Sequence, residues 1–461
     1  MGNMASEQIF HAAQHPRRAI LTQAAPIVLG QVAVMANGLI DNIMAGQASA
    51  QVLAAMAVGS SIYISLYVGL MGVIIGLTPI CSAHYGAGRT REIGLDTAQG
   101  IWIALLLSVV GLAVLLNPDF LFELTNTPAD IANNTRGYLN GVALGLPAAL
   151  VFRVFYAMNQ SISRPAVVMA LQVLMLVFKV PLNVWFMHGG WGLPALGAAG
   201  FGWASTVTMW CILGISVWMW RWDSHYNEFK VRALVWPNVQ RIRKILVLGL
   251  PIGGSYLIEV TSFTFIALLV SRFGVFEVGG HQIVSNLAAL AYMLALGIAN
   301  ATTVTTAQQL GAGDHRAAAS MIRHGIELAV LAATCVCAAF YCLDHQLIAL
   351  YTHDAQVIAV ALKLMPWMIA YHFIDAIQTV CSFALRAHQV SARPLLVYFI
   401  SLWGVGIGGG MWLGVWREPA LQTEGFWIAS ALGLLLACAG LVALLAYTLK
   451  KQARQQVGLP V

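Results

Sequence analysis

The sequence predicts an all-α polytopic membrane protein with about twelve transmembrane helices in two six-helix bundles, related by a pseudo-two-fold axis along the membrane normal. Three observations lead to this fold class. The 461 residues are 59% hydrophobic and only 9% charged, whereas a soluble domain carries about 25% charged residues. Apolar runs of about 20 residues, long enough to cross the hydrocarbon core of a bilayer, recur along the chain. The two halves of the chain also repeat one another.

The apolar runs are expected to be helices, because backbone N–H and C=O groups in lipid must be paired within their own segment. No stretch between the runs is long enough to form a sizeable soluble domain. The predicted helices cover residues 18–44, 52–81, 97–116, 136–160, 166–187, 196–221, 241–272, 279–307, 322–343, 361–386, 395–414 and 424–448.

The basic residues follow membrane topology, so the formal charge of +6 does not indicate a nucleic-acid partner. With the N-terminus inside, the inner segments hold 19 of the 24 Lys and Arg residues, among them Arg164, Arg386 and Lys450. Such an excess marks the cytoplasmic side of a membrane. We therefore expect a multi-pass protein of the cytoplasmic (inner) membrane with both termini in the cytoplasm.

Two segments carry the internal repeat. "AHYGAGRTREIGLDTAQGI" (83–101) and "AQQLGAGDHRAAASMIRHGI" (307–326) share a Gly-Ala-Gly turn and a later Gly-Ile pair, and Gly86 precedes Gly311 by 225 residues. Each Gly-Ala-Gly is interpreted as a helix C-cap followed by a tight turn.

The repeat also predicts the domain organisation. The same offset relates Pro26 to Pro251, in the first helix of each half. Two halves with an even number of helices share one orientation in the membrane, so their symmetry axis lies along the membrane normal. We predict an N-lobe over 1–222, a cytoplasmic connector over 223–240 and a C-lobe over 241–461.

The sequence favours a transporter over an enzyme. It has no Gly-Lys pair for a phosphate-binding loop, no Gly-x-Ser-x-Gly and no His-Glu-x-x-His. Its seven cysteines lie in or beside apolar runs without Cys-x-x-Cys spacing and are interpreted as packing thiols. Duplicated helical bundles typically move a solute. Without a nucleotide site, an ion gradient would supply the energy, so no organic cofactor is expected.

Among the acids inside predicted helices, three are singled out as candidates: Asp41, Glu259 and Asp375. A central charge costs about 2.5–3.5 kcal/mol on insertion scales, so such residues usually serve an ion or substrate pathway. The alternative is a carboxylate at a helix end or in an internal salt bridge, and Asp41 lies near the outer end of its helix.

The surroundings of Glu259 and Asp375 are rich in oxygen atoms. Glu259 shares a helix face with neighbouring hydroxyl groups, and Asp375 lies on a polar face of its own helix. Polar residues on these helices and on the helix after Glu259 include Ser255, Ser262, Tyr371, His372, Gln378, Thr379, Ser382, Gln282, Ser285, Asn286 and Tyr292. Such a pocket suits Na⁺ or a carboxyl pair that shares a proton.

Several motifs resemble the MATE (multidrug and toxic compound extrusion) transporters, and the NorM branch in particular. They are "PIVLGQVAVMANGLIDNIMAG", "YGAGR", "FKVPLNVWF", "PIGGSYLIEVTSF" and "LGAGDHRAA". The resemblance covers essentially the whole chain. It implies twelve helices in two bundles facing a central cleft, and antiport of Na⁺ or H⁺ against amphipathic, usually cationic, drugs.

The resemblance also implies roles for single residues. Asp41 matches the family's N-lobe acid, Glu259 and Asp375 match its C-lobe cation acids, and Tyr292 matches a C-lobe cleft tyrosine. We expect Glu259, Asp375, Tyr292, Ser255 and Gln282 to form the cation-coupling site, with Na⁺ possible at the two acids. The expected N-lobe cavity contains Asp41, Asn37, Lys179, Asn183 and Gln172.

One position departs from the family pattern. Where NorM-like chains resemble Asn-x-Pro-Leu-Asn, this sequence reads "KVPLN", with Lys179 in place of the first Asn. Gln172, Lys179 and Asn183 form one stripe on their helix. Lys179 would either extend to the membrane interface or face the N-lobe cavity and pair with Asp41. A pair would keep Asp41 ionised and weaken any role for it as a proton carrier.

Two further features are interpreted as structural. "GVGIGGGMWLGVW" (404–416) contains the small-x-x-x-small spacings Gly404/Gly408 and Gly410/Gly414, which predict close helix packing. Some of the 14 tryptophans, Trp412, Trp416 and Trp427 among them, are expected in interfacial belts.

The predicted function is secondary active efflux of amphipathic, mostly cationic compounds in exchange for Na⁺ or H⁺, by a monomer that works through alternating access. A flippase for lipid-linked precursors is the alternative within the same architecture, although only Lys179 is a clear candidate to bind phosphate. A membrane-embedded enzyme or a sensor is the alternative from another class.

Overall fold

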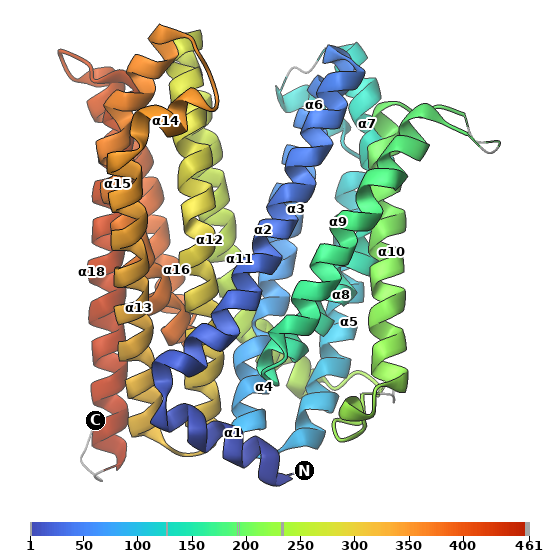
Figure 1. The fold of residues 1–461 in the computed structure, drawn as a ribbon, viewed down its shortest axis with the longest axis vertical. Helices are drawn as coiled ribbons and strands as arrows, with labels where there is room; N and C mark the ends of the chain where they lie inside the picture. The colour runs from blue at the N-terminus through green and yellow to red at the C-terminus, as the bar shows by residue number, and fades with distance from the viewer. Residues whose placement is uncertain (1, 126–127, 191, 193, 232–234, 457–461) are drawn as a thin grey trace. The chain divides into compact units, whose positions relative to one another are not determined.

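The computed structural model describes residues 2–125, 128–190, 192, 194–231 and 235–456. Contacts divide the chain into two compact units. Residues 29–253 form one, here called the N-terminal unit. Residues 1–28 and 254–461 form the other, the C-terminal unit. Each is a bundle of helices, whose course along the chain is shown by the colours of Figure 1.

The helices of the N-terminal unit include parts of α2 and α11, which continue into the other unit. They are α2 (Pro16–Ala48), α3 (Ala50–Ile75), α4 (Leu77–Gly86), α5 (Thr90–Leu115), α6 (Asp119–Thr125), α7 (Ala129–Ala143), α8 (Leu146–Ser161), α9 (Pro165–His188), α10 (Ala198–Trp222), the short 3₁₀ helix η1 (Ser224–Asn227) and α11 (Val239–Val270).

The C-terminal unit holds the remaining parts of α2 and α11 and all later helices. Its own elements are α1 (Gly2–Gln14), the 3₁₀ helix η2 (Ser271–Phe273), α12 (Val275–Gly311), α13 (His315–Cys342), α14 (Asp344–Ala349), α15 (Ala355–Ala387), α16 (Ala392–Tyr398), the π-helix η3 (Phe399–Gly408), α17 (Gly409–Met411), the π-helix η4 (Trp412–Trp416) and α18 (Gln422–Gln456).

The predicted membrane spans are confirmed. In the described part of the chain, 11 helices are long and apolar enough to cross a membrane. The count rises to 12 if α7 and α8, which meet at a bend of 46°, form one span. Residues 50–86, comprising α3 and α4, count as a single span.

The turns of the repeat have the same geometry in both halves, as the Gly-Ala-Gly motifs predict. Gly88 (φ +68°) and Gly313 (φ +81°) follow α4 and α12 in the left-handed conformation. The Arg89 N–H donates to the His84 carbonyl at 2.9 Å, and the Asp314 N–H donates to the Gln309 carbonyl at 3.0 Å. These are Schellman caps, in which glycine adopts a positive φ without strain.

The compact units end at different residues from the predicted lobes. The connector and the start of α11 belong to the N-terminal unit, because Arg241 pairs with acids of α5 and Gly249 packs against the backbone of Val73. Residues 1–28 belong to the C-terminal unit, because Arg17 pairs with Glu327 of α13 at 2.9 Å. Both boundaries, 28/29 and 253/254, fall two residues after the prolines related by the repeat.

The described part of the connector packs against other helices of the N-terminal unit. Tyr226 is fully buried, and its hydroxyl donates to Asn159 Oδ1 of α8 at 2.6 Å. Burial alone would raise the pKa of Asp223, but hydrogen bonds from the His225 backbone N–H and the Arg164 guanidinium lower it. Burial and the same guanidinium also lower the pKa of His225. The connector is therefore held by specific contacts.

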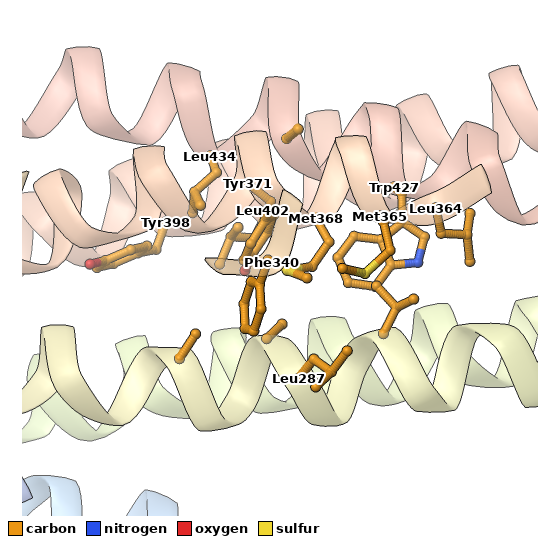
Figure 2. Packing of buried hydrophobic residues seen from close by; sticks show 14 of the residues in the cluster. Leu287, Phe340, Leu364, Met365, Met368, Tyr371, Tyr398, Leu402, Trp427 and Leu434 are labelled. Atoms are coloured by element: carbon orange, nitrogen blue, oxygen red, sulfur yellow. The ribbon is translucent and has the colours of Figure 1, made fainter. Parts of the chain in front are cut away.

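A buried apolar cluster joins α12, α13, α15 and α18 in the C-terminal unit. Figure 2 shows Tyr371, Tyr398 and Trp427 within it, with Leu287 on the facing α12. The prediction of an interfacial Trp427 is wrong, since this ring is only 3% exposed and its N–H donates to His281 Nδ1 at 3.2 Å. The other two predicted belt tryptophans, Trp412 and Trp416, are exposed.

The glycine-rich segment is largely π-helical, a geometry that the spacing of its glycines did not predict. Close packing is confirmed at Gly410 and Gly414, where an added Cβ would lie 2.4 Å and 2.8 Å from the Phe426 ring of α18. It is not found at Gly404, where a Cβ would meet nothing within 4 Å. At Gly410 and Gly414, the absence of a side chain permits the close approach of α18.

Candidate functional site

Two of the three intramembrane acids lie close together in the C-terminal unit. Glu259 is on α11, two turns after Pro251, and Asp375 is on α15. The Asp375 carboxylate repels that of Glu259, and the side chain of Asp375 is almost fully buried. The sequence had placed both acids on polar helix faces, and the structure brings the two faces together.

A chain of hydrogen bonds fixes the Asp375 carboxylate. Gln378 Nε2 donates to Asp375 Oδ1 at 2.7 Å, and the Thr379 hydroxyl lies 3.5 Å from the same oxygen. The Tyr398 hydroxyl in turn donates to Gln378 Oε1 at 2.7 Å. Because Gln378 uses both ends of its amide, its orientation is set and Asp375 Oδ1 is held in one position.

Arg386 completes the site and was not expected there. Its place near a predicted helix end suggests an inner loop segment, but it lies in the last turn of α15 with 5% of its surface exposed. Its guanidinium stacks 3.8 Å over the Phe383 ring, donates to the Tyr256 hydroxyl at 3.2 Å and attracts Glu259. Arg386 follows Asp375 by three helical turns, so the helical periodicity could have revealed it.

The remaining residues predicted for this site occupy different surroundings. Tyr292 of α12 lies within electrostatic range of Glu259 and Asp375. Ser255, one turn before Glu259, is buried. Gln282 is exposed and hydrogen-bonds to Asn286 at 3.2 Å, with no contact to either acid among the described side chains.

The third acid, Asp41, lies in the N-terminal unit and is paired with Lys179. Lys179 Nζ is 3.1 Å from Asp41 Oδ2, and the two side chains are 8% and 14% exposed. Asn183 Nδ2 donates to Asp41 Oδ1 at 2.6 Å. Lys179 therefore faces the interior of this unit and does not extend to a membrane interface.

Gln172 and Asn37 lie on the same two helices as this pair. Gln172 is buried on α9 against Gly30, where an added Cβ would lie 2.1 Å from its Oε1. Asn37, one turn before Asp41, donates to the Ala33 carbonyl at 3.0 Å. Gln172, Lys179 and Asn183 are all buried, so the predicted stripe of α9 faces inward.

The two acidic sites differ in charge. In the C-terminal unit, the Arg386 guanidinium attracts Glu259 without a direct ion pair among the described residues, so two carboxylates stand against one positive charge when both acids are ionised. In the N-terminal unit, one carboxylate faces one ammonium and the charges cancel. Buried charges are stable only when paired and hydrogen-bonded, so the first site favours an additional cation and the second does not.

Known proteins agree with this architecture. The MatE family model matches residues 26–185 and 251–412, two segments whose starts differ by the repeat offset of 225. The chain belongs to the MATE family.

Its relatives include a protein of Aromatoleum aromaticum named "Probable multidrug resistance protein NorM", which is 37% identical over 89% of this chain and 90% of the relative. A NorM of Chromobacterium violaceum is 35% identical over 95% of both chains. The crystal structure of the eukaryotic MATE transporter AtDTX14 has a TM-score of 0.84 at 17% identity, covering 96% of this chain and 98% of that one. This NorM-like MATE chain is a membrane transporter and not an enzyme.

Proposed function

We propose that this MATE transporter exports amphipathic, mostly cationic compounds in exchange for Na⁺ or H⁺. The coupling cation binds at Glu259 and Asp375 in the C-terminal unit, and both termini of the chain are cytoplasmic. Relatives named multidrug resistance proteins support drug-like substrates. Their bacterial source and the many membrane spans support an inner-membrane location.

The observation that carries the proposal is the charge imbalance around Glu259. Two carboxylates within helices are costly, and Arg386 compensates only one of them. Binding of Na⁺ or H⁺ would neutralise the second charge. Competition between this cation and a cationic drug, or a change of shape that depends on the neutralisation, would couple the two fluxes.

Reconstituted protein offers a direct test. Efflux of a fluorescent organic cation is measured in proteoliposomes with an imposed Na⁺ gradient, an imposed pH gradient, or neither. One gradient should drive accumulation against the drug's own gradient in the wild type, and which one does so identifies the coupling ion.

Glu259→Gln and Asp375→Asn keep the size of each side chain but remove its charge. Both variants should equilibrate the dye without accumulating it. Glu123→Gln makes the same chemical change at an exposed acid of α6 and should behave as the wild type. Wild-type accumulation by either site variant would overturn the assignment of the coupling site.

A further inference from the structure

Lys179 occupies a position in the N-terminal unit that is built from acceptor groups. Its ammonium contacts Asp41 Oδ2 and donates to the Ser205 hydroxyl of α10. The three side chains come from three different helices, α2, α9 and α10. The pair therefore lies in the interior of the helix bundle and not on its surface.

The hydrogen-bond directions around the ammonium are fixed. The Ser205 hydroxyl donates its proton to the Phe201 carbonyl at 2.8 Å, so its oxygen can only accept from Lys179. The Asn183 amide nitrogen donates to Asp41 Oδ1, which leaves Asp41 Oδ2 for the ammonium. Both groups that meet Lys179 Nζ within the described part of the chain thus present lone pairs, as the ligands of a cation do.

Asn183 carries a buried acceptor that Lys179 does not reach. Its side chain is fully buried, and its Oδ1 has no hydrogen-bond partner within the part of the chain that the structure describes. Turning the amide over would place this oxygen against the Asp41 carboxylate, so the orientation is set by charge. A buried acceptor without a donor is unusual, and Asn183 Oδ1 could accept a hydrogen bond from a ligand or coordinate a cation.

We propose that the ammonium of Lys179 is a tethered cation that permanently fills a cation site formed by Asp41 and Ser205. The site therefore does not exchange ions with solution, and Asp41 offers no uncompensated charge to a cationic substrate. A second consequence, which rests on the proposed function, is that Glu259 and Asp375 form the single exchangeable cation site of the transporter.

Removing the lysine should empty the site for a free cation. The purified Lys179→Ala variant is titrated with n-propylammonium, whose three carbons and ammonium correspond to the Cγ, Cδ, Cε and Nζ atoms that the substitution removes. We expect a dose-dependent rise in the melting temperature of this variant. The wild type and Lys179→Ala/Asp41→Asn should show none, because the site is filled in the first and lacks its charge in the second. Tetramethylammonium, which has no N–H donor, should be inactive.

Lys179→Met tests the inorganic ion, because methionine retains the bulk of the lysine stem. Na⁺ should stabilise this variant more than it stabilises the wild type, and the addition of Asp41→Asn should remove the difference. These melting-temperature measurements use neither an ion gradient nor a drug. They can therefore contradict the proposal for Lys179 while the gradient assay supports coupling at Glu259 and Asp375, and they can support it while the gradient assay contradicts that coupling.

Equal stabilisation by n-propylammonium of the wild type and of Lys179→Ala would overturn the proposal, as would no stabilisation of a folded Lys179→Ala. If Lys179→Ala does not fold by itself, n-propylammonium present during extraction must yield folded Lys179→Ala, and it must not improve the yield of folded Lys179→Ala/Asp41→Asn. Failure to obtain folded Lys179→Ala in this way would equally reject a tethered cation.

Discussion

Replacing Arg241 with methionine is expected to destabilise the protein much more than replacing Arg17, although both residues lie near the start of the first helix of a half. Arg241 donates to Asp96 Oδ1 at 2.7 Å and to Glu92 Oε2 at 2.6 Å, and the Asp96 side chain is only 5% exposed. Arg17 reaches Glu327 at 2.9 Å, but these two side chains are 65% and 34% exposed.

The difference in burial sets the magnitudes. Removing one partner of a buried pair costs about 3–5 kcal/mol, because the remaining charge stays buried without compensation. His84 Nε2 remains 3.2 Å from Asp96 Oδ2 and reduces this penalty, so we expect the lower end, about 3 kcal/mol. An exposed pair such as Arg17 with Glu327 contributes about 0–1 kcal/mol.

Thermal unfolding in detergent micelles or nanodiscs measures the contrast. For a unit of about 200 residues, 1 kcal/mol shifts the melting temperature by about 2–4 °C. We therefore expect a drop of about 6–12 °C for Arg241→Met and at most a few degrees for Arg17→Met. Adding Asp96→Asn to Arg241→Met should recover part of the loss, because the buried charge is then absent. Equal shifts for the two single variants, or a further drop in the double variant, would refute the reasoning.

Three other changes test the remaining parts of the structure. Tyr398→Phe removes the donor to Gln378, so we expect several-fold more coupling cation to be needed for half-maximal efflux; an unchanged requirement would show that this bond does not position the acid. Burial lowers the pKa of His225 below its ordinary value of 6.5 in the folded connector. As pH falls through about 6.5, the unfolded connector therefore binds a proton at His225 that the folded connector does not bind, and the folded connector should become less stable. Amide hydrogen exchange of the connector at about pH 7 and about pH 5.5 measures this, with His225→Gln expected to show less change. Gly410→Ala places a Cβ 2.4 Å from a buried phenylalanine ring and should lower the melting temperature, whereas Gly404→Ala meets open space and should not; equal effects would contradict the packing.

The length of the apolar runs and the internal repeat predicted most of the fold, and helical periodicity predicted part of both sites. Lys179 and Asn183 fall on one stripe, and the stripe faces inward because polar groups in a bundle avoid lipid. The charge count did not separate Arg386 from the loop residues, because it assigns any arginine near a helix end to the nearest loop. Trp427 was misplaced for a related reason. A tryptophan near a helix end fits either an interface or a core, and only its partner His281 decides between them.

The unit boundaries could not be predicted from the repeat, because they depend on tertiary contacts. The repeat relates segments by sequence, whereas a compact unit is defined by packing. Residues 1–28 pack with helices of the opposite half of the sequence, through contacts such as Gln309 Nε2 donating to the Ile9 carbonyl at 2.8 Å. No local pattern in the first segment indicates a partner so far along the chain.

The discontinuous C-terminal unit has a consequence for biosynthesis. Residues 1–28 leave the ribosome first, but α12 and α13, against which they pack, follow only after the whole of residues 29–253. At about 5–20 residues per second, translation of that stretch takes about 10–45 s, during which the first segment has no native partner. The N-terminal unit can be completed from one continuous stretch, whereas the C-terminal unit needs both ends of the polypeptide. A gene fragment that begins at the connector therefore encodes a whole sequence repeat but only an incomplete folding unit.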